Sequence, residues 1–351
     1  MAWVLDTEYI EPEELTAVVR QSLAEQQINR FTLSRYLPNV AIDDITFKFS
    51  KGGTGGLAEA SVYRAWDTES RIGRREGVAE VMGELPPISE KIPLNEYDSL
   101  RIRNMETTDP MRRAIARDGY RIATNIAARF ELGKGEALAN AQFTINENNL
   151  ALAPVQFGRK AEHSVTAAVL WSSHATAKPL DDLEAWVQVY VDTNGSQPDR
   201  MIMPRTVLAH MRQCDQVVRQ VYPLAPSGSS PMVSVEQLNT VLSSLDLPAI
   251  ELNDARVSVD GTPTRVMPSD ALVFVPAPGA EDASQPTDLG GFLLGTTAES
   301  LEPEYSSVAE RAGVVAATWK TKDPVRLWTH AAAVGMPVVR EPNLTFKAKV
   351  I

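Results

Sequence analysis

Cysteine is almost absent from this sequence, with Cys214 as the only one among 351 residues. One thiol cannot form a disulfide within the chain, and it rules out the cysteine-rich zinc frameworks. We expect Cys214 to be a small buried thiol on a helix over about residues 208–221, because unreactive cysteines are usually packed as apolar groups. The sequence therefore predicts neither a disulfide scaffold nor a cysteine-based active site.

Long apolar runs are also lacking. No stretch approaches the roughly 18 uninterrupted apolar residues of a membrane span. The N-terminus, MAWVLDTEYIEPEEL, carries acidic residues where a signal peptide has a basic start and a long apolar run. We therefore expect no membrane partner and a protein that stays in the cytoplasm where it is made.

Positive charge is in the minority, with 34 Lys and Arg against 45 Asp and Glu and a formal net charge of -11. Phosphate binding requires clustered Lys and Arg, so any contact with DNA is expected to be weak and without sequence specificity. A protein that encloses DNA can nevertheless be acidic, because a negative inner wall repels the polymer. The charge argues against a protein that holds nucleic acid through its overall field.

Motifs of catalysis and metal binding are missing as well. The sequence has no HExxH or GxSxG motif, and the glycine-rich segment at 51–56 lacks the Lys and Ser or Thr that follow the last glycine of a phosphate loop. The four histidines show no i, i+4 pairing: His163, His174, His210 and His330. We expect no catalytic residue, no cofactor and no metal, and we interpret 51–56 as a hinge.

The composition that is present is that of a globular protein, with 44% hydrophobic and 23% charged residues. The length exceeds that of one simple core, so we expect two or three lobes. Helical and strand-like patterns alternate along the chain, which predicts an α+β fold. The expected helices are 179–191, 205–221 and 235–245, and the expected strands are 201–204 and 271–276, with a β-prone run at 163–171.

The first 50 residues read as an extended arm with one helix that starts at Glu11 and Pro12. Its apolar stripe is Leu15, Val18, Val19 and Leu23. Because this stripe is narrow, we expect the helix to order chiefly on a neighbouring subunit. The first 30 residues hold six acidic residues against two arginines, which suits a neighbour's basic surface. An amphipathic helix on the same subunit explains the pattern equally well.

Residues 60–103 carry seven basic and eight acidic side chains, with three prolines between short strand-like runs. We interpret this segment as a projecting hairpin that contacts neighbouring subunits, because interleaved charges can fix register and partner choice. An ordinary charged surface loop is the alternative. The residues expected at the contact are Arg71, Arg74, Arg75, Glu76, Glu80 and Glu84.

The clearest helix begins near Asp109, with Pro110 in its first turn. Its apolar stripe is Met111, Ile115, Ile122, Ile126 and Phe130, and arginines occupy the other faces. A helix that runs as far as Asn140 would be about 48 Å long at 1.5 Å per residue. Gly133 and Gly135 are the positions where we expect it to bend or end. We expect its stripe to face a sheet made partly from residues 314–350.

Five stretches, in this order, resemble the phage lambda major head protein (protein E) family, whose members have the Hong Kong 97-type capsid fold. They are GELPPISEKIPLNEYDSLRI (83–102), the arginine-rich helix with ALANAQFTI (137–145), VQFGRKAEHSVTAAVLW (155–171), KPLDDLEAWVQVYVDTNGSQPDRMIMPRTVLAHM (178–211) and KDPVRLWTHAAAVGMPVV (322–339). Together they cover most of the chain.

The resemblance implies an α+β fold with a long spine helix and two domains, called peripheral and axial. The expected parts are an N-terminal arm at 1–55, an extended loop at 56–103, a peripheral domain with the spine helix at 104–179, an axial domain at 180–312 and a return to the peripheral domain at 313–351. Because no long scaffolding segment precedes the arm, we expect that any scaffold is a separate protein or was removed.

The function implied is that of a major capsid protein, without catalysis, which self-assembles into the icosahedral shell around the double-stranded DNA of a phage. Its expected partners are copies of itself in hexamers and pentamers, a scaffold and a portal, with a decoration protein as a further possibility. Assembly is expected in the host bacterial cytoplasm and residence in the virion capsid. Another self-assembling virion protein, of tail or connector, and a soluble α+β enzyme are the alternatives.

Overall fold

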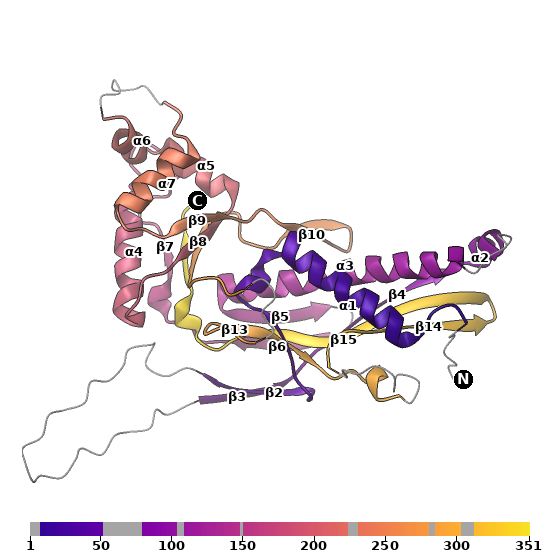
Figure 1. The fold of residues 1–351 in the computed structure, drawn as a ribbon. Helices are drawn as coiled ribbons and strands as arrows, with labels where there is room; N and C mark the ends of the chain where they lie inside the picture. The colour runs from indigo at the N-terminus through magenta and orange to yellow at the C-terminus, as the bar shows by residue number, and fades with distance from the viewer. Residues whose placement is uncertain are drawn as a thin grey trace, which may run out of the picture.

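The computed structural model describes residues 8–51, 79–103, 109–147, 150–223, 231–280, 285–302 and 312–351. Figure 1 shows a long flat lobe, a second lobe standing at one end of it, and a hairpin that extends from the first lobe. The two lobes correspond to the two large clusters of buried apolar side chains. Among the described residues, no helix combines the length and the hydropathy that a membrane span needs.

The first lobe is built on a sheet whose central strand is β15 (Val325–Val339). β15 pairs antiparallel with β14 (Val315–Lys322), β4 (Pro87–Leu94) and β13 (Gly290–Gly295). β1 (Asn39–Ala41) adds a parallel pairing to β13. Two helices, α1 (Pro12–Asn29) and α3 (Asp109–Asn140), lie along this sheet (Figure 1). The 3-10 turn η1 (Thr32–Arg35) connects α1 to β1.

The long helix α3 confirms the prediction of a helix from Asp109. Met111, Ile115, Ile122 and Ile126 are all buried in the core of the first lobe, where α3 packs on β15 and β4. The helix continues through both of its late glycines as 32 residues, so they neither end nor break it. They serve close packing instead, as described below for the seam between the lobes.

Helix α1 differs from the expectation that its stripe orders on a neighbour. Leu15 and Val19 are fully buried, and Leu23 is buried nearly as well, in the same core as α3. Val18 is only half-buried. The physical reason is a close fit between helices: the missing side chain of Gly119 on α3 leaves room for Leu15 and Val19. The helix therefore fits the alternative interpretation, an amphipathic helix that packs on its own subunit.

The second lobe contains a mixed sheet in the order β7 (Ser164–Thr166), β16 (Phe346–Lys349), β12 (Ala271–Val275), β8 (Arg200–Met203) and β9 (Ala249–Leu252). Its helices are α4 (Pro179–Asn194), α5 (Arg205–Gln213), α6 (Asp215–Val221) and α7 (Val235–Ser244). Ser234 caps α7 through a reciprocal pair of hydrogen bonds with Gln237. Large side chains fill the core, among them Trp171, Tyr190 and Phe346.

Four expectations about where elements lie need correction. The C-terminal segment does not return wholly to the first lobe, because β16 is hydrogen-bonded between β7 and β12 and buries Phe346 in the second core. Conversely, β13, expected in the axial domain, belongs to the first sheet. The single helix expected over 205–221 is interrupted at Cys214, whose backbone is extended and whose thiol is buried. In the β-prone run at 163–171, only 164–166 form a strand.

Three hairpins complete the described chain: β2 (Thr46–Lys51) with β3 (Ala79–Glu84), β5 (Gln142–Glu147) with β6 (Leu150–Gln156), and β10 (Arg256–Val259) with β11 (Thr262–Arg265). Helix α2 (Glu96–Arg103) follows β4 at the far end of the long lobe (Figure 1). Short 3-10 turns are η2 (Ala161–His163), η3 (Glu299–Leu301) and η5 (Pro342–Leu344).

Candidate functional site

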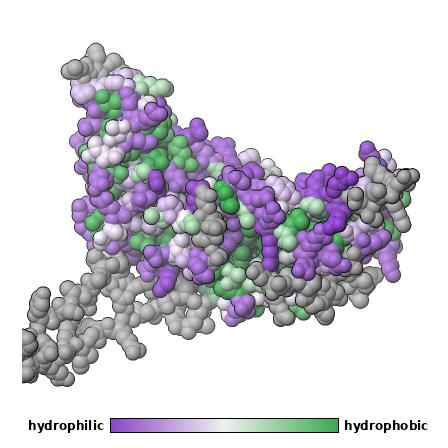
Figure 2. Space-filling view, in the orientation of Figure 1, coloured by the Kyte–Doolittle hydropathy of each residue, from purple (hydrophilic) through white to green (hydrophobic). Residues whose placement is uncertain are grey.

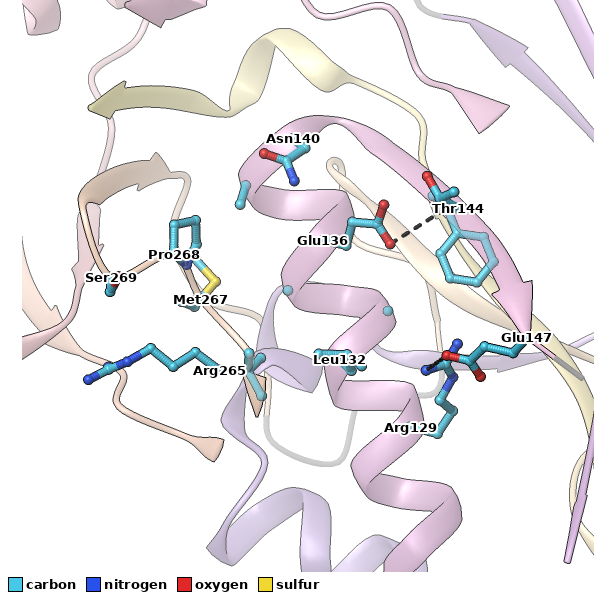
Figure 3. Close-up of a pocket in the computed structure, with 15 residues that line it drawn as sticks. Arg129, Leu132, Glu136, Asn140, Thr144, Glu147, Arg265, Met267, Pro268 and Ser269 are labelled. Carbon is cyan, nitrogen blue, oxygen red and sulfur yellow. Dashed lines mark hydrogen bonds and ion pairs between the residues drawn. The ribbon is translucent and has the colours of Figure 1, made fainter. Parts of the chain in front are cut away.

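A cavity of about 430 Å³ lies at the seam between the lobes, between the last turns of α3, strand β5 and the segment 265–269 (Figure 3). Its charged side chains have partners within the subunit. Arg129 Nη1 lies 2.9 Å from Glu147 Oε1, and Glu136 Oε2 accepts a hydrogen bond from the Thr144 amide at 3.4 Å. Both carboxylates of the cavity are therefore engaged in contacts within the subunit.

The same seam explains the two glycines of α3. A Cβ atom at Gly135 would lie against the carbonyl oxygen of Val266, closer than van der Waals contact allows. A Cβ atom at Gly133 would lie 3.2 Å from the ring of Phe143, a close contact that a shift of the ring by a few tenths of an ångström would relieve. Gly135 therefore lets the spine helix approach the backbone of the segment that enters the second lobe. The cavity is a structural joint.

A buried charged pair sits one turn earlier on α3. Glu131 and Lys134 are both almost completely buried. Glu131 Oε1 accepts a hydrogen bond from the Leu33 amide at 3.1 Å, and Lys134 Nζ donates to Asn39 Oδ1 at 3.0 Å. Burial raises the pKa of Glu131 to about 7, against the attraction of Lys134, and lowers the pKa of Lys134 to about 8. The pair ties the segment between α1 and β1 to the spine helix.

The histidines do not come together as a metal site. His163 is buried with Nδ1 3.2 Å from the Thr345 carbonyl oxygen, and His330 packs against the ring of Trp319. His174 Nε2 and His210 Nδ1 lie 2.9 Å apart as a hydrogen-bonded pair. Within the described ranges, no three His, Cys, Asp or Glu side chains are placed to hold a metal ion.

The predicted contact residues of the extended loop fall mostly on undescribed positions. Arg71, Arg74, Arg75 and Glu76 lie outside the described residues. Glu80 and Glu84 belong to β3, opposite Ser50 and Thr46 of β2, and Glu84 is exposed. The loop therefore leaves the body through the β2–β3 hairpin, which pairs within itself (Figure 1).

The base of this hairpin is held by short-range hydrogen bonds. The Asp44 carboxylate accepts from the Ile45 and Thr46 amides at 2.7 and 3.1 Å, and these bonds lower the pKa of Asp44. Leu85 N donates to the Ile45 carbonyl at 2.8 Å, just where β3 ends. The Asp44 carbonyl itself lies against Gly295 of β13, where a Cβ atom would not fit. These contacts fix where the hairpin departs from the first lobe.

An exposed apolar patch at the far end of the long lobe was not predicted. Tyr97 and Leu100 of α2 are 74% and 63% exposed, and Val325 at the start of β15 is 53% exposed. Val325 N donates to Glu96 Oε1 at 3.0 Å, which joins α2 to the β14–β15 turn. Exposed apolar side chains that gather in one place mark interaction surfaces. In the sequence, charged residues surround Tyr97 and Leu100, so the segment does not read as apolar. The one signal for the patch is the spacing of these two residues, which places them on the same face of a helix.

Comparison with known proteins gives one family and a consistent fold. The family of phage major capsid protein E matches residues 14–350. A protein of Escherichia coli CFT073, described as a candidate prophage capsid protein, is 16% identical with a TM-score of 0.63, over 97% of this chain and 99% of that one. A phage-related protein of Bordetella bronchiseptica RB50 is 13% identical with a TM-score of 0.60, over 99% and 98%. No curated protein matches the chain.

At these identities the two solved structures are evidence for the fold only. The family match extends over nearly the whole chain. The α+β fold of Hong Kong 97 type, predicted from the order of motifs, is confirmed. So is the prediction of a protein that forms a capsid shell. The chain belongs to the phage major capsid protein E family.

Proposed function

We propose that this protein is the subunit of an icosahedral phage head, in which hexamers and pentamers of the chain enclose double-stranded DNA. The observation that carries the proposal is the family match across residues 14–350. Self-assembly follows from the family, whereas the symmetry and the cargo are part of the proposal. The subunit works without catalysis, and the described residues supply packing and charge contacts instead.

The geometry of the subunit supports contacts with copies of itself. Its long lobe ends in the exposed patch of Tyr97, Leu100 and Val325, at one extreme of the molecule (Figure 1). The β2–β3 hairpin leaves the lobe at another position and pairs only within itself among the described strands. Surfaces that point in different directions allow one subunit to join several neighbours, as a closed shell of repeated interfaces requires.

Further partners are proposed from the family role. A separate scaffold protein guides assembly, a portal occupies one vertex, and a decoration protein can bind the finished shell. DNA touches the inner wall weakly, since a net charge of -11 opposes tight binding of a polyanion. Assembly takes place in the host bacterial cytoplasm, and the assembled protein resides in the virion capsid.

Electron microscopy of the purified, concentrated protein tests this function. Closed shells are the expected result, either alone or with a scaffold protein from the same phage. Open tubes or rings would point to a tail or connector protein. Dispersed monomers under both conditions, together with turnover of a substrate, would favour an α+β enzyme and overturn the proposal.

A further inference from the structure

The core of the first lobe holds an amine, a side-chain amide and a carboxyl close together. Lys134 Nζ donates a hydrogen bond to Asn39 Oδ1 at 3.0 Å. Glu131 precedes Lys134 by three residues on α3, so the two side chains lie on one face of the helix. Both are 1% exposed, and Asn39 is half-buried. Buried lysines are normally paired with a carboxylate, so the direct contact of this one with an amide requires an explanation.

The surroundings of the amine are apolar. The ring centroid of Phe292 lies 5.5 Å from Lys134 Nζ, and Phe292 packs in turn on Phe130, with 4.4 Å between the ring centroids. Both rings are buried in the core of the lobe. The surface over α1 and α3 in Figure 2 is mixed and predominantly hydrophilic, so the apolar surroundings belong to the interior. An amine that has left water for such surroundings is favoured in its uncharged form, which is the nucleophile.

The neighbouring carboxyl can take the proton that the amine must give up. Burial raises the pKa of Glu131 and lowers the pKa of Lys134, so the two values lie close together. In water the pKa of a lysine lies about 6 above that of a glutamic acid, and the neutral pair is then on the order of one part in a million. In this core the transfer from Lys134 to Glu131 is far less unfavourable. An amine and a carboxylic acid therefore coexist beside the amide.

We propose that Lys134 and Asn39 join through an amide bond within the subunit, and that Glu131 carries the protons of the reaction. Nζ attacks Cγ of Asn39, the Cγ–Nδ2 bond breaks, and a new Cγ–Nζ bond forms. Starting from the ammonium, Nζ loses two of its three protons. Both pass by way of Glu131 to Nδ2, which leaves as ammonium, so that Glu131 ends unchanged. Because Nζ already contacts Oδ1, a rotation of the amide about its Cβ–Cγ bond brings Cγ within reach.

The leaving nitrogen has a way out of the protein. Asn39 lines a cavity of about 920 Å³ beside α1, β1 and β14, together with Arg20, Leu23 and Val314. The attacking amine, by contrast, is almost completely buried. Ammonium can therefore depart through the cavity while the amine stays shielded from water.

Such a bond would reinforce the first lobe. Asn39 belongs to β1 and Lys134 to α3, and the two residues are 95 positions apart in the sequence. A covalent link across a loop of this length restricts the unfolded chain, as a disulfide does. A chain with one cysteine has no disulfide within itself, and an amide bond is not opened by thiol exchange. The inference concerns the single subunit and goes beyond the proposed shell function.

A second lysine–asparagine contact in the same chain provides a comparison. Lys347 Nζ donates to Asn140 Oδ1 at 2.8 Å, but Asn140 is exposed and Lys347 is only half-buried. The side chain of Asp270, which attracts Lys347, is 41% exposed and is paired with Lys349. Because this amine is in contact with water and its carboxylate is partly exposed, we expect no bond between Lys347 and Asn140.

Intact-mass spectrometry of the purified full-length protein, under denaturing conditions, tests the inference. We expect the wild-type mass to fall short of the sequence mass by one ammonia. After trypsin, residues 36–48 and 130–159 should appear as one joined peptide, because the acylated Lys134 is no longer a cleavage site. Glu131→Gln should leave most chains at the full mass, since general acid–base groups contribute roughly 100-fold or more in rate. The matched control, Lys347→Arg, should show the same loss of ammonia as wild type.

Three results would overturn the inference. The first is a wild-type protein of full mass, a measurement that does not depend on the folding of any variant. The second is a loss of ammonia without the joined peptide, which would assign the loss to cyclisation of an asparagine such as Asn194, which precedes Gly195. The third is an equal loss in Glu131→Gln that is folded by circular dichroism, which would remove Glu131 from the reaction. Shell formation, recorded by electron microscopy, is a separate readout that tests the proposed function alone.

Discussion

The hydroxyl of Thr16 and the backbone of Ala316 exchange two hydrogen bonds: Thr16 Oγ1 donates to the Ala316 carbonyl at 3.1 Å and accepts from its amide at 3.0 Å. Ala316 belongs to β14, which ends the first sheet. Arg20 extends the contact by donating from Nε to the Val314 carbonyl at 2.9 Å. Helix α1 thus takes the place of a further strand and closes this part of the sheet edge, which would otherwise be free to pair with another chain.

Replacing Thr16 with Val should destabilise the subunit, because it leaves a buried amide and carbonyl of Ala316 without partners. We expect the free energy of unfolding in urea to fall by about 1–3 kcal/mol. Thr240→Val on α7 makes the same change at an exposed helix position and should stay within about 0.5 kcal/mol of wild type. Equal effects at both positions would mean that the β14 contact contributes nothing.

Deletion of residues 1–30 tests the position of α1. A separable arm would leave a folded core, but Leu15 and Val19 are fully buried beside α3. Removing large buried side chains costs about 2–5 kcal/mol each, so we expect the truncated subunit to unfold at a clearly lower temperature or to aggregate. A truncated protein with unchanged thermal unfolding would restore the view that the arm belongs to a neighbour.

At Gly135, an alanine should destabilise the joint between the lobes. The new methyl group would press on the Val266 carbonyl, which is backbone and cannot rotate away. Overpacking of this kind costs about 1–3 kcal/mol in urea unfolding. Gly133→Ala is the matched control: its methyl group meets only side chains, the rings of Phe143 and Pro337, and the gain of about 1 kcal/mol in helix propensity should leave it neutral or stabilised. The reverse order of the two variants would contradict the assignment of Gly135 to the seam.

The spine helix was predictable because its apolar stripe repeats at helical spacing over many turns, from Met111 to Phe130. The position of α1 was not predictable. Its apolar stripe shows that one face is buried but does not show against which chain. The residue that binds Thr16 of α1, Ala316, is 300 residues away in the sequence. The predicted contact residues Leu15, Val19 and Leu23 are accordingly core residues of this subunit.

Other differences have equally local causes. The helix expected over 205–221 has no Pro or Gly at its break, so the extended backbone of Cys214 leaves no trace in the residue pattern. Strand β16 has only four residues, and its neighbours β7 and β12 are remote in the sequence, so its sheet could not be chosen from periodicity. The buried pair of Glu131 and Lys134 was missed because two charged residues on a helix normally face solvent.

The buried carboxyl of Glu131 makes stability depend on pH. Its pKa is raised to about 7 in the folded protein from an ordinary 4.5, chiefly by burial. Between these two values the unfolded chain has lost a proton that the folded protein still holds, so the contribution of Glu131 to stability falls as pH rises from about 4.5 to about 7. Above pH 7 this contribution stays at its lowest level.

Glu131→Gln should remove that fall, since the amide stays neutral and its oxygen can still accept from the Leu33 amide. We expect the stability of the variant, measured by urea unfolding at pH 5, 6 and 7, to rise relative to wild type with increasing pH, by an amount on the order of 1–3 kcal/mol. Glu25→Gln at an exposed position of α1 should run parallel to wild type. Parallel curves for Glu131→Gln as well would show that its carboxyl does not titrate in this range.

Charge reversal in the extended loop tests its role between subunits. Arg74 and Arg75 lie in the segment that joins β2 to β3, outside the described residues. If the mixed charges of this loop meet complementary charges on a neighbour, Arg74→Glu with Arg75→Glu places like charges in contact at every repeated interface, and like-charge contacts oppose association strongly. We expect few or misshapen shells by electron microscopy, and an unchanged circular dichroism spectrum of the isolated subunit, because the two substitutions leave the buried side chains of both cores unchanged. The double variant Arg256→Glu with Arg340→Glu makes the same change of net charge at two exposed positions of the described chain, and as the control it should assemble as wild type does. Normal shells from the loop variant would show that these two arginines face solvent in the assembled head, and a lost dichroism signal would show that they belong to the fold of the subunit.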